Sequence, residues 1–420
     1  FAVKGPDGKW IPSAVAAREE AEVAYEGAAR EGHAPALLEH SAGNELSARV
    51  SAIAPRGVTE ILITYVQVLE AGTSYVVPLK GLPATALSID IDVRATGRGE
   101  GASRTFALHQ QNPTGLAPQQ DFVVEARSLP RSPGLRNGDL VVARVVPFGT
   151  SRPDPITSAV VMIDTSASRT LGIAEQANLV RRVFAKLPPD AHVSVACFDQ
   201  EVAPIYDGTT AGFGESEVAA IVARGALGAS DMQRAITWAG EEAARRSAKR
   251  VILVSDGVST AGETDNQKIK ADIEKLRASK VERVDAIAVG GVRDDSFFRS
   301  VVRGVLDKDG VVLDADLGAD ALARRLSEKT TSGLALHVDG AKWSWPRTLD
   351  GIQAGDEVMV YAEIADGLPF QVDVAGQSFS PELRPMARPL LERVWAQAKI
   401  ESLIEAPTLD PVSTRNEIIA

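Results

Sequence analysis

Oxygen-bearing side chains follow two apolar segments, and one more precedes a helical stretch, in the central part of the chain. Asp164, Ser166 and Ser168 form a D-x-S-x-S sequence directly after the apolar run AVVMI. Ser230 lies in the sequence GASD, and Asp256 directly follows the run VILVS. Two carboxylates and three hydroxyls suit a hard cation such as Mg²⁺, which prefers oxygen ligands and retains several waters. Because two carboxylates only balance the charge of the ion, the ion should still attract a carboxylate from outside the chain.

The segments that must position these residues alternate between strand and helix patterns. Short apolar strands are followed by helical stretches such as GIAEQANLVRRVFAKL and MQRAITWAGEEAARR. Residues 158–331 are therefore expected to form a parallel sheet flanked by helices, with the polar residues gathered at the carboxyl ends of its strands. Taken alone, D-x-S-x-S is equally typical of a helix cap. Its coincidence with Ser230 and Asp256 favours a metal site.

The flanking regions have a different pattern of apolar and polar residues. Residues 1–148 contain short alternating strands, typical of a β-sandwich, and one Ala- and Glu-rich segment with helical spacing. Residues 149–157 contain two prolines and turn formers, which indicates a linker. Residues 332–420 predict a small β region followed by an amphipathic helix. The predicted fold class is thus α/β plus β.

Composition limits the classes of partner. The 420 residues carry a net charge of −11 and no block of like charge, which argues against binding to nucleic acid or to an anionic membrane. No apolar run approaches the length of a membrane span, so we expect no direct membrane insertion. The single cysteine, Cys197, lies in the apolar run VSVACF and predicts a buried small side chain. An exported or cell-surface location is favoured over a cytoplasmic one.

Other kinds of site find less support. The loop after the first central strand reads DTSASRTLG rather than G-x-G-x-x-G, so a dinucleotide site is not expected, and Gly290-Gly291 is interpreted as a strand-end turn. The pair His33 and His40 is interpreted as surface or packing residues rather than metal ligands. Trp343 and Trp345 are expected to pack against a sheet, with a ligand-binding surface as the alternative. No nucleophile or general base accompanies the metal residues, so no enzyme activity is expected.

The sequences DTSAS, GASD and VSDG resemble the metal-ion-dependent adhesion site of von Willebrand factor A domains, over about residues 158 to 330. The resemblance implies that Ser166, Ser168 and Ser230 would contact the ion directly. Asp164 and Asp256 would hold it mainly through waters, and an acidic side chain of a partner protein would complete the coordination. Mg²⁺ is the expected ion, with Mn²⁺ or Ca²⁺ as alternatives. Ser230 stands where that family commonly has threonine.

The segment AYEGAAREGHAPALLEH and the strands after it resemble the vault protein inter-alpha-trypsin (VIT) domain. The order of the two resemblances is that of inter-alpha-trypsin inhibitor heavy chains and their relatives, and the composition favours a bacterial relative. Phe1 falls inside the VIT pattern, so the first strands of that domain are expected upstream. The resemblance implies a metal-dependent adhesion module that grips a protein partner. The alternative is a structural scaffold in which the metal only stabilises the fold.

Overall fold

The computed structural model of the chain describes residues 132–405 apart from 171 and 387. N-terminal to these it describes residues 1–5, 7–31, 35–40, 46–51, 53, 56–65, 69, 74–77, 79, 89–99, 102–112 and 121–125. His33, one of the two histidines considered above, lies outside the described residues. His40 lies in a strand. None of the helices in the described part of the chain combines the length and the apolar character that crossing a bilayer requires.

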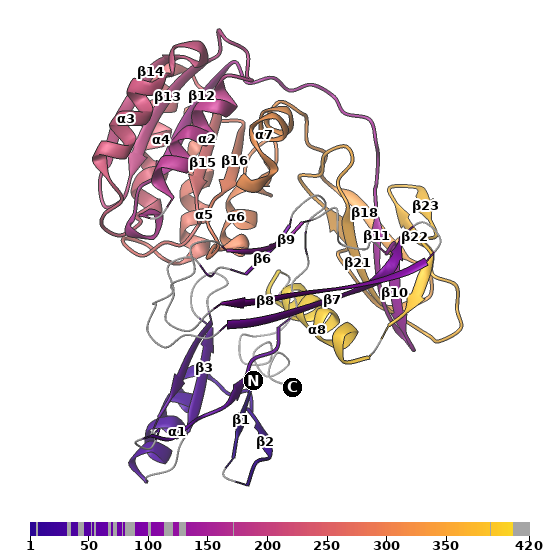
Figure 1. Ribbon diagram of the computed structural model, residues 1–420. Helices are drawn as coiled ribbons and strands as arrows, with labels where there is room; N and C mark the ends of the chain where they lie inside the picture. The colour runs from indigo at the N-terminus through magenta and orange to yellow at the C-terminus, as the bar shows by residue number, and fades with distance from the viewer. Residues whose placement is uncertain are drawn as a thin grey trace.

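A six-stranded sheet forms the centre of the α/β unit (Figure 1), with the strand order β14-β13-β12-β15-β16-β17. Neighbouring strands are parallel except at the edge, where β14 runs antiparallel to β13. The strands are β12 Ser158–Asp164, β13 His192–Phe198, β14 Val202–Thr209, β15 Arg250–Ser255, β16 Arg283–Ala288 and β17 Val312–Asp314. The predicted parallel sheet is therefore confirmed, with one antiparallel edge strand added.

Helices cover both faces of this sheet because its strands are apolar on both sides. Val161 and Ile163 of β12 pack with α2 (Ile173–Phe184), α3 (Glu215–Arg224) and α7 (Ala319–Leu326). Val160 and Met162 of the same strand pack with α4 (Met232–Arg246), α5 (Asn266–Lys275) and α6 (Asp295–Val302). Short 3₁₀ turns lie at Ala167–Arg169, Thr210–Gly212, Leu276–Ser279 and Ala315–Leu317.

A second core lies between two sheets built largely from C-terminal residues. The first has the order β19-β21-β11-β10-β24 and the second β20-β18-β22-β23. Their strands are β10 Gly134–Asn137, β11 Leu140–Val145, β18 Leu334–Val338, β19 Ala341–Trp345, β20 Thr348–Leu349, β21 Val358–Ile364, β22 Val372–Val374, β23 Gln377–Phe379 and β24 Leu383–Pro385. Alternate residues of β11 face this core, with Val141 and Ala143 among them.

Helix α8, Arg388–Glu405, covers the opposite face of the five-stranded sheet, as the sequence pattern predicts. Leu391 and Ala398 of this helix are buried against Leu140 and Val142 of β11. Trp343 packs edge-on against Trp395 of the helix, at 5.3 Å between ring centroids, and Trp345 packs against Tyr361. The two tryptophans thus supply packing area between sheet and helix, which is the preferred sequence interpretation.

Strands β10 and β11 precede the α/β unit but pair with strands that follow it. β11 is antiparallel to β21, with Leu140 opposite Glu363, and β10 is parallel to β24. The expected boundary at residue 148 thus separates these two strands from the sheet that contains them. We propose a division in which residues 134–148 belong with the C-terminal strands, so that the α/β unit is an insertion between β11 and β18.

The described N-terminal segments form sheets of two or three strands and one helix, α1 Arg18–Arg30, which lies in the segment predicted to be helical. β1 Ala2–Lys4 pairs with β2 Trp10–Pro12 and β5 Ile61–Leu62, while β3 Ala36–His40 pairs with β4 Leu46–Val50. β6 Tyr75–Val77 pairs with β9 Phe122–Val124, and β7 Ile89–Gly99 forms a long hairpin with β8 Ala102–Asn112.

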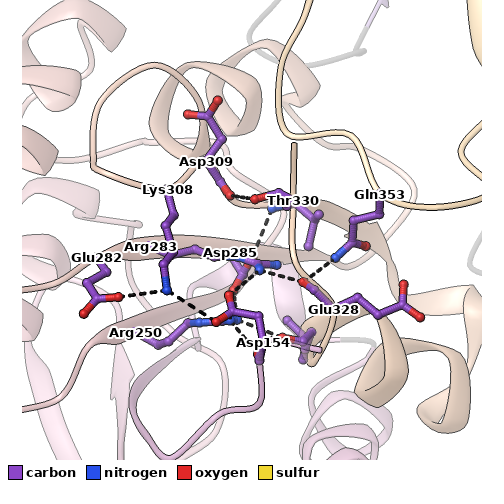
Figure 2. A network of polar contacts seen from close by, with 12 residues as sticks. Asp154, Arg250, Glu282, Arg283, Asp285, Lys308, Asp309, Glu328, Thr330 and Gln353 are labelled. Atoms are coloured by element: carbon purple, nitrogen blue, oxygen red, sulfur yellow. Dashed lines mark hydrogen bonds and ion pairs between the residues drawn. The ribbon is translucent and has the colours of Figure 1, made fainter. Parts of the chain in front are cut away.

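The incoming and outgoing segments of the α/β unit meet beside the N-terminal ends of β15 and β16. Pro153 and Glu328 form an isolated antiparallel bridge, and the Asp154 amide donates to the Ser327 carbonyl at 2.8 Å. Figure 2 shows the polar network at this junction. We call its charged residues the stem cluster: Asp154, Arg250, Glu282, Arg283, Asp285 and Lys308.

The stem cluster pairs its buried charges with one another. The carboxylate of Asp285 accepts from Arg283 Nε at 2.7 Å and from Arg250 Nη1 at 3.0 Å, and both Asp285 and Arg283 are fully buried. Arg250 also donates to the Asp154 carboxylate at 2.6 Å, and Arg283 to the Glu328 carbonyl at 2.8 Å. The two arginines therefore tie both ends of the α/β unit to its sheet.

Replacing Asp285 with Asn should destabilise the protein strongly, because it leaves two buried guanidinium groups short of negative charge. We expect a loss of about 3–5 kcal/mol in the free energy of unfolding, measured by urea titration. The matched control is Asp320→Asn, since Asp320 pairs with Lys186 through side chains that are 83% and 52% exposed. That change should cost less than about 1 kcal/mol. Equal losses in the two variants would contradict this account of the stem cluster.

Glu282 gives the stem cluster an acid-sensitive contact. Hydrogen bonds from Lys249 and Lys308 lower the pKa of Glu282 from 4.5 to about 2. Because the folded-state pKa lies below the ordinary value, the contribution of Glu282 is complete above pH 4.5 and is lost as the pH falls towards 2.

Glu282→Gln should therefore lower the free energy of unfolding by up to about 1 kcal/mol at neutral pH, a small effect because the side chain is partly exposed. The difference from the parent protein should shrink below pH 4.5. Urea titrations at about pH 7 and about pH 3.5 measure the two differences. A difference that stays constant with pH would rule out the lysine contacts as its source.

Candidate metal centre

The three predicted loops meet at the carboxyl edge of the six-stranded sheet. β12 and β15 are neighbours, but the chain continues from β12 to β13 on one side and from β15 to β16 on the other. Open α/β sheets bind ligands at such a reversal of strand order, just beyond the carboxyl ends of the strands. Asp164 is the last residue of β12, and Asp256 directly follows β15. The topology thus brings the two predicted carboxylates to one place.

Asp164 is fully buried and accepts hydrogen bonds from two loops and from the last residue of β15. Its Oδ1 accepts from the Ser166 amide at 2.9 Å. Its Oδ2 accepts from the Ser255 hydroxyl at 2.6 Å and from the Ser230 hydroxyl at 3.4 Å. The carboxylate is therefore held in a fixed orientation at the bottom of the candidate site.

The remaining predicted residues form a second hydrogen-bonded row. The hydroxyls of Ser166 and Ser168 lie 3.0 Å apart, and Ser168 donates to Asp256 Oδ2 at 2.7 Å. The other oxygen of Asp256 accepts from the Val258 amide at 3.0 Å. The structure thus brings Asp164, Ser166, Ser168, Ser230 and Asp256 together through direct contacts.

Backbone hydrogen bonds hold the Ser230 loop in place. The Ser230 carbonyl accepts from the amides of Thr260 and Ala261, both at 3.0 Å, and the Ser230 amide donates to the Thr260 hydroxyl at 2.8 Å. The next residue, Asp231, caps α4 by accepting from the Arg234 amide at 3.0 Å. The hydroxyl of Ser230 is therefore positioned by the loop after β15 and by the start of α4.

Negative charge at the site is only partly neutralised by the protein. Burial and the nearby charge of Asp256 raise the pKa of Asp164. Among the described residues, no lysine, arginine or histidine forms an ion pair with Asp164. Asp256, in contrast, pairs with Arg169, whose Nη2 lies 2.7 Å from Asp256 Oδ2. Within the described residues, the buried Asp164 carboxylate therefore accepts hydrogen bonds from hydroxyls and an amide but has no ion-pair partner.

The donor set fits a hard divalent cation. All five predicted side chains offer oxygen, and the buried Asp164 carboxylate lacks a cationic partner within the described part of the chain. Within the same residues, no group of three or more His, Cys, Asp or Glu is placed to hold a metal. A metal here would accordingly depend on the serine hydroxyls and on water, as Mg²⁺ sites with few protein carboxylates do.

Two further residues at the site are not identified from the sequence. Ser255 precedes Asp256 directly, and its hydroxyl both donates to Asp164 and accepts from the Gly257 amide at 2.9 Å. Arg169 directly follows D-x-S-x-S and is buried. Each adjoins a predicted ligand, which is the signal that the sequence offers. Their contacts, however, depend on how the loops fold back on one another.

Parts of the chain resemble known proteins. Residues 2–65 match the family model of the vault protein inter-alpha-trypsin domain, which confirms the N-terminal resemblance. No curated protein matches the chain at a significant level. The fold assignment of the α/β unit depends on its hydrogen-bonded strand order.

Solved structures with some likeness to the chain include proteins of the von Willebrand factor A type. The ArnB paralog VWA2 from Sulfolobus acidocaldarius is 17% identical, with 66% of this chain and 83% of that chain covered and a TM-score of 0.34. A von Willebrand factor type A protein from Catenulispora acidiphila is 14% identical, with 64% and 80% covered and a TM-score of 0.34. The manganese-loaded TRAP protein of Plasmodium vivax is 13% identical, with 55% and 100% covered and a TM-score of 0.32.

Ser255→Ala should destabilise the protein by about 1–3 kcal/mol, because it removes a hydrogen bond from a buried carboxylate. Thermal and urea unfolding of the metal-free protein measure the loss. The control is Ser158→Ala, since the Ser158 hydroxyl makes only a 3.5 Å contact with the Ser247 carbonyl at the opposite end of the sheet. If both alanine variants unfold like the parent protein, Ser255 does not support Asp164 in the way described.

Proposed function

We propose that the chain is a protein-binding module whose contact point is a divalent cation held at the carboxyl edge of the six-stranded sheet. Ser166, Ser168 and Ser230 would contact the ion directly, and Asp164 and Asp256 would hold it mainly through waters. Mg²⁺ is the preferred ion because every donor is oxygen and few are charged, with Mn²⁺ or Ca²⁺ as alternatives.

One observation carries this proposal. The buried carboxylate of Asp164 accepts from the hydroxyls of Ser230 and Ser255 and, within the described residues, has no cation of its own. Burying an anion without a partner is costly, and a divalent cation at this point would remove that cost. The strand order supports the proposal, since it places the residues where open α/β sheets bind ligands.

The partner that we propose is a protein that presents an aspartate or glutamate. Two carboxylates of the chain balance the charge of a divalent ion, and the three serines add no charge. The ion therefore remains a Lewis acid that can bind a further carboxylate. The hydroxyls orient the ion, and the buried base of the site excludes bulk water from one side. We propose binding rather than catalysis, because the five residues include no free general base or nucleophile beside the ion.

Removing Asp164 should strongly weaken metal binding. Titration calorimetry of Mg²⁺ and Mn²⁺ into chelator-treated protein should show one site, and Asp164→Ala should weaken it by at least about 100-fold, since it deletes the central carboxylate. Ser230→Ala should weaken it less. Asp320→Asn, which changes an exposed carboxylate elsewhere, should leave the affinity unchanged. Equal metal binding by Asp164→Ala and the parent would overturn the proposed site.

Peptide selection on the same protein tests whether the partner presents an acidic residue. Displayed peptides selected on the Mg²⁺-loaded protein should contain Asp or Glu, and their binding should disappear with chelator, with Asp164→Ala, or when the acidic residue is changed to its amide. A protein that binds metal and gains stability but selects peptides without an acidic residue supports the alternative, a scaffold whose metal is structural.

A further inference from the structure

The guanidinium of Arg169 lies inside the candidate metal site. Its Nη2 is 2.7 Å from Asp256 Oδ2, and its Nε donates to the Ser168 hydroxyl at 3.2 Å. Both partners belong to the proposed metal-binding set. The side chain is only 7% exposed, so this is an internal cation and not a surface residue that happens to point towards the site.

The structure provides a fitted pocket for this guanidinium at the carboxyl end of β16. Nη1 of Arg169 donates to the Val289 carbonyl at 2.8 Å. The next residue, Gly290, has φ of +85°, and a Cβ atom built on it would collide with both terminal nitrogens of the guanidinium. A glycine at residue 290 therefore leaves the space that Arg169 occupies. Three polar contacts and a close backbone approach define one position for the side chain.

Arg169 and a metal ion make opposing demands on the same oxygens. Asp256 Oδ2 already accepts a hydrogen bond from Ser168 and forms an ion pair with Arg169. An ion held by Ser168 and by Asp256 would face the positive guanidinium across this oxygen, and like charges at such a separation repel each other beside the buried Asp256 carboxylate. With two carboxylates and one guanidinium, the site has a formal charge of −1 rather than −2. The arginine thus lowers the attraction of the site for any cation.

We propose that Arg169 is a built-in competitor of the metal: its guanidinium and a divalent ion would compete for Asp256 Oδ2 and the Ser168 hydroxyl, and the guanidinium would withdraw when the ion binds. This inference rests on the proposed metal site and concerns how that site is regulated. It assigns Arg169 the role of setting the metal affinity. Because the ion must displace the guanidinium, the site binds metal only at a concentration of free metal higher than the serines and carboxylates alone would need.

Two kinds of variant test the competition. Arg169→Met removes the charge but keeps an unbranched side chain, and it should bind Mg²⁺ about tenfold more tightly than the parent chain in calorimetry. Arg182→Met is the matched control, because Arg182 is an exposed residue near the C-terminal end of α2 and its loss changes the net charge equally. That control should bind Mg²⁺ as the parent does.

The second variant keeps the arginine and removes its pocket. Gly290→Ala should push the guanidinium away from Asp256 and also tighten Mg²⁺ binding, whereas Gly291→Ala, whose added Cβ meets nothing within 4 Å, should not. Thermal unfolding of each variant with and without Mg²⁺ gives an independent readout. The increase in melting temperature on adding Mg²⁺ should be larger for Arg169→Met and Gly290→Ala than for the parent and the two controls.

The outcomes separate this inference from the proposed function. If the parent binds Mg²⁺, Asp164→Ala does not, and Arg169→Met binds no more tightly than the parent, competition is overturned while the metal site stands. If Arg169→Met binds but the parent does not, competition is supported and metal-dependent binding by the natural chain is overturned. If neither binds, both are overturned.

Discussion

The pairing of buried charge in the stem cluster is the constraint on which the rest of the structure depends. Arg283 and Asp285 are fully buried at the start of β16, where an unpaired charge would cost several kcal/mol. Arg283, besides pairing with Asp285, contacts Asp154 of the incoming segment and the Glu328 carbonyl of the outgoing segment. These two contacts form only when both ends of the α/β unit lie together. The stem therefore fixes the unit as an insertion with adjacent ends, and the first residues of its central strands are held in register there.

Charged side chains at the opposite edge of the same sheet are only partly paired. In the stem cluster the arginines and aspartates neutralise one another through short contacts. At the carboxyl edge, only Asp256 of the two buried carboxylates pairs with an arginine, and Asp164 accepts hydrogen bonds from hydroxyls and an amide. The charges of the stem cluster thus neutralise one another, whereas the carboxyl edge keeps an excess of negative charge. This contrast is why we propose a structural role for the stem cluster and a binding role for the carboxyl edge.

The sequence predicts most of the candidate site because parallel strands impose a simple rule. Residues that directly follow such strands meet at one edge, so Asp164 and Asp256 can be grouped without any coordinates. Arg169 could not be assigned in the same way, since its partners Asp256 and the Val289 carbonyl are far away in the sequence and its pocket depends on the backbone of Gly290. The metal itself stays a prediction. The pairing of β11 with β21 was missed for a related reason: alternating apolar residues show that a strand exists and not which strand it joins.

The insertion also affects how the protein emerges from the ribosome. β11 and β21 are neighbours in the folded sheet, yet Leu140 and Glu363 are 223 residues apart. At a synthesis rate of about 5–20 residues per second, β11 waits roughly 11–45 seconds for that neighbour. Throughout this interval its Val141, Val142 and Ala143 present an apolar edge strand of the kind that nascent chains use to aggregate. The α/β unit is made during the delay, and by folding first it shortens the path between the waiting strand and its late partners. During synthesis, the inserted unit must therefore fold before the late strands can complete the sheet that contains β11.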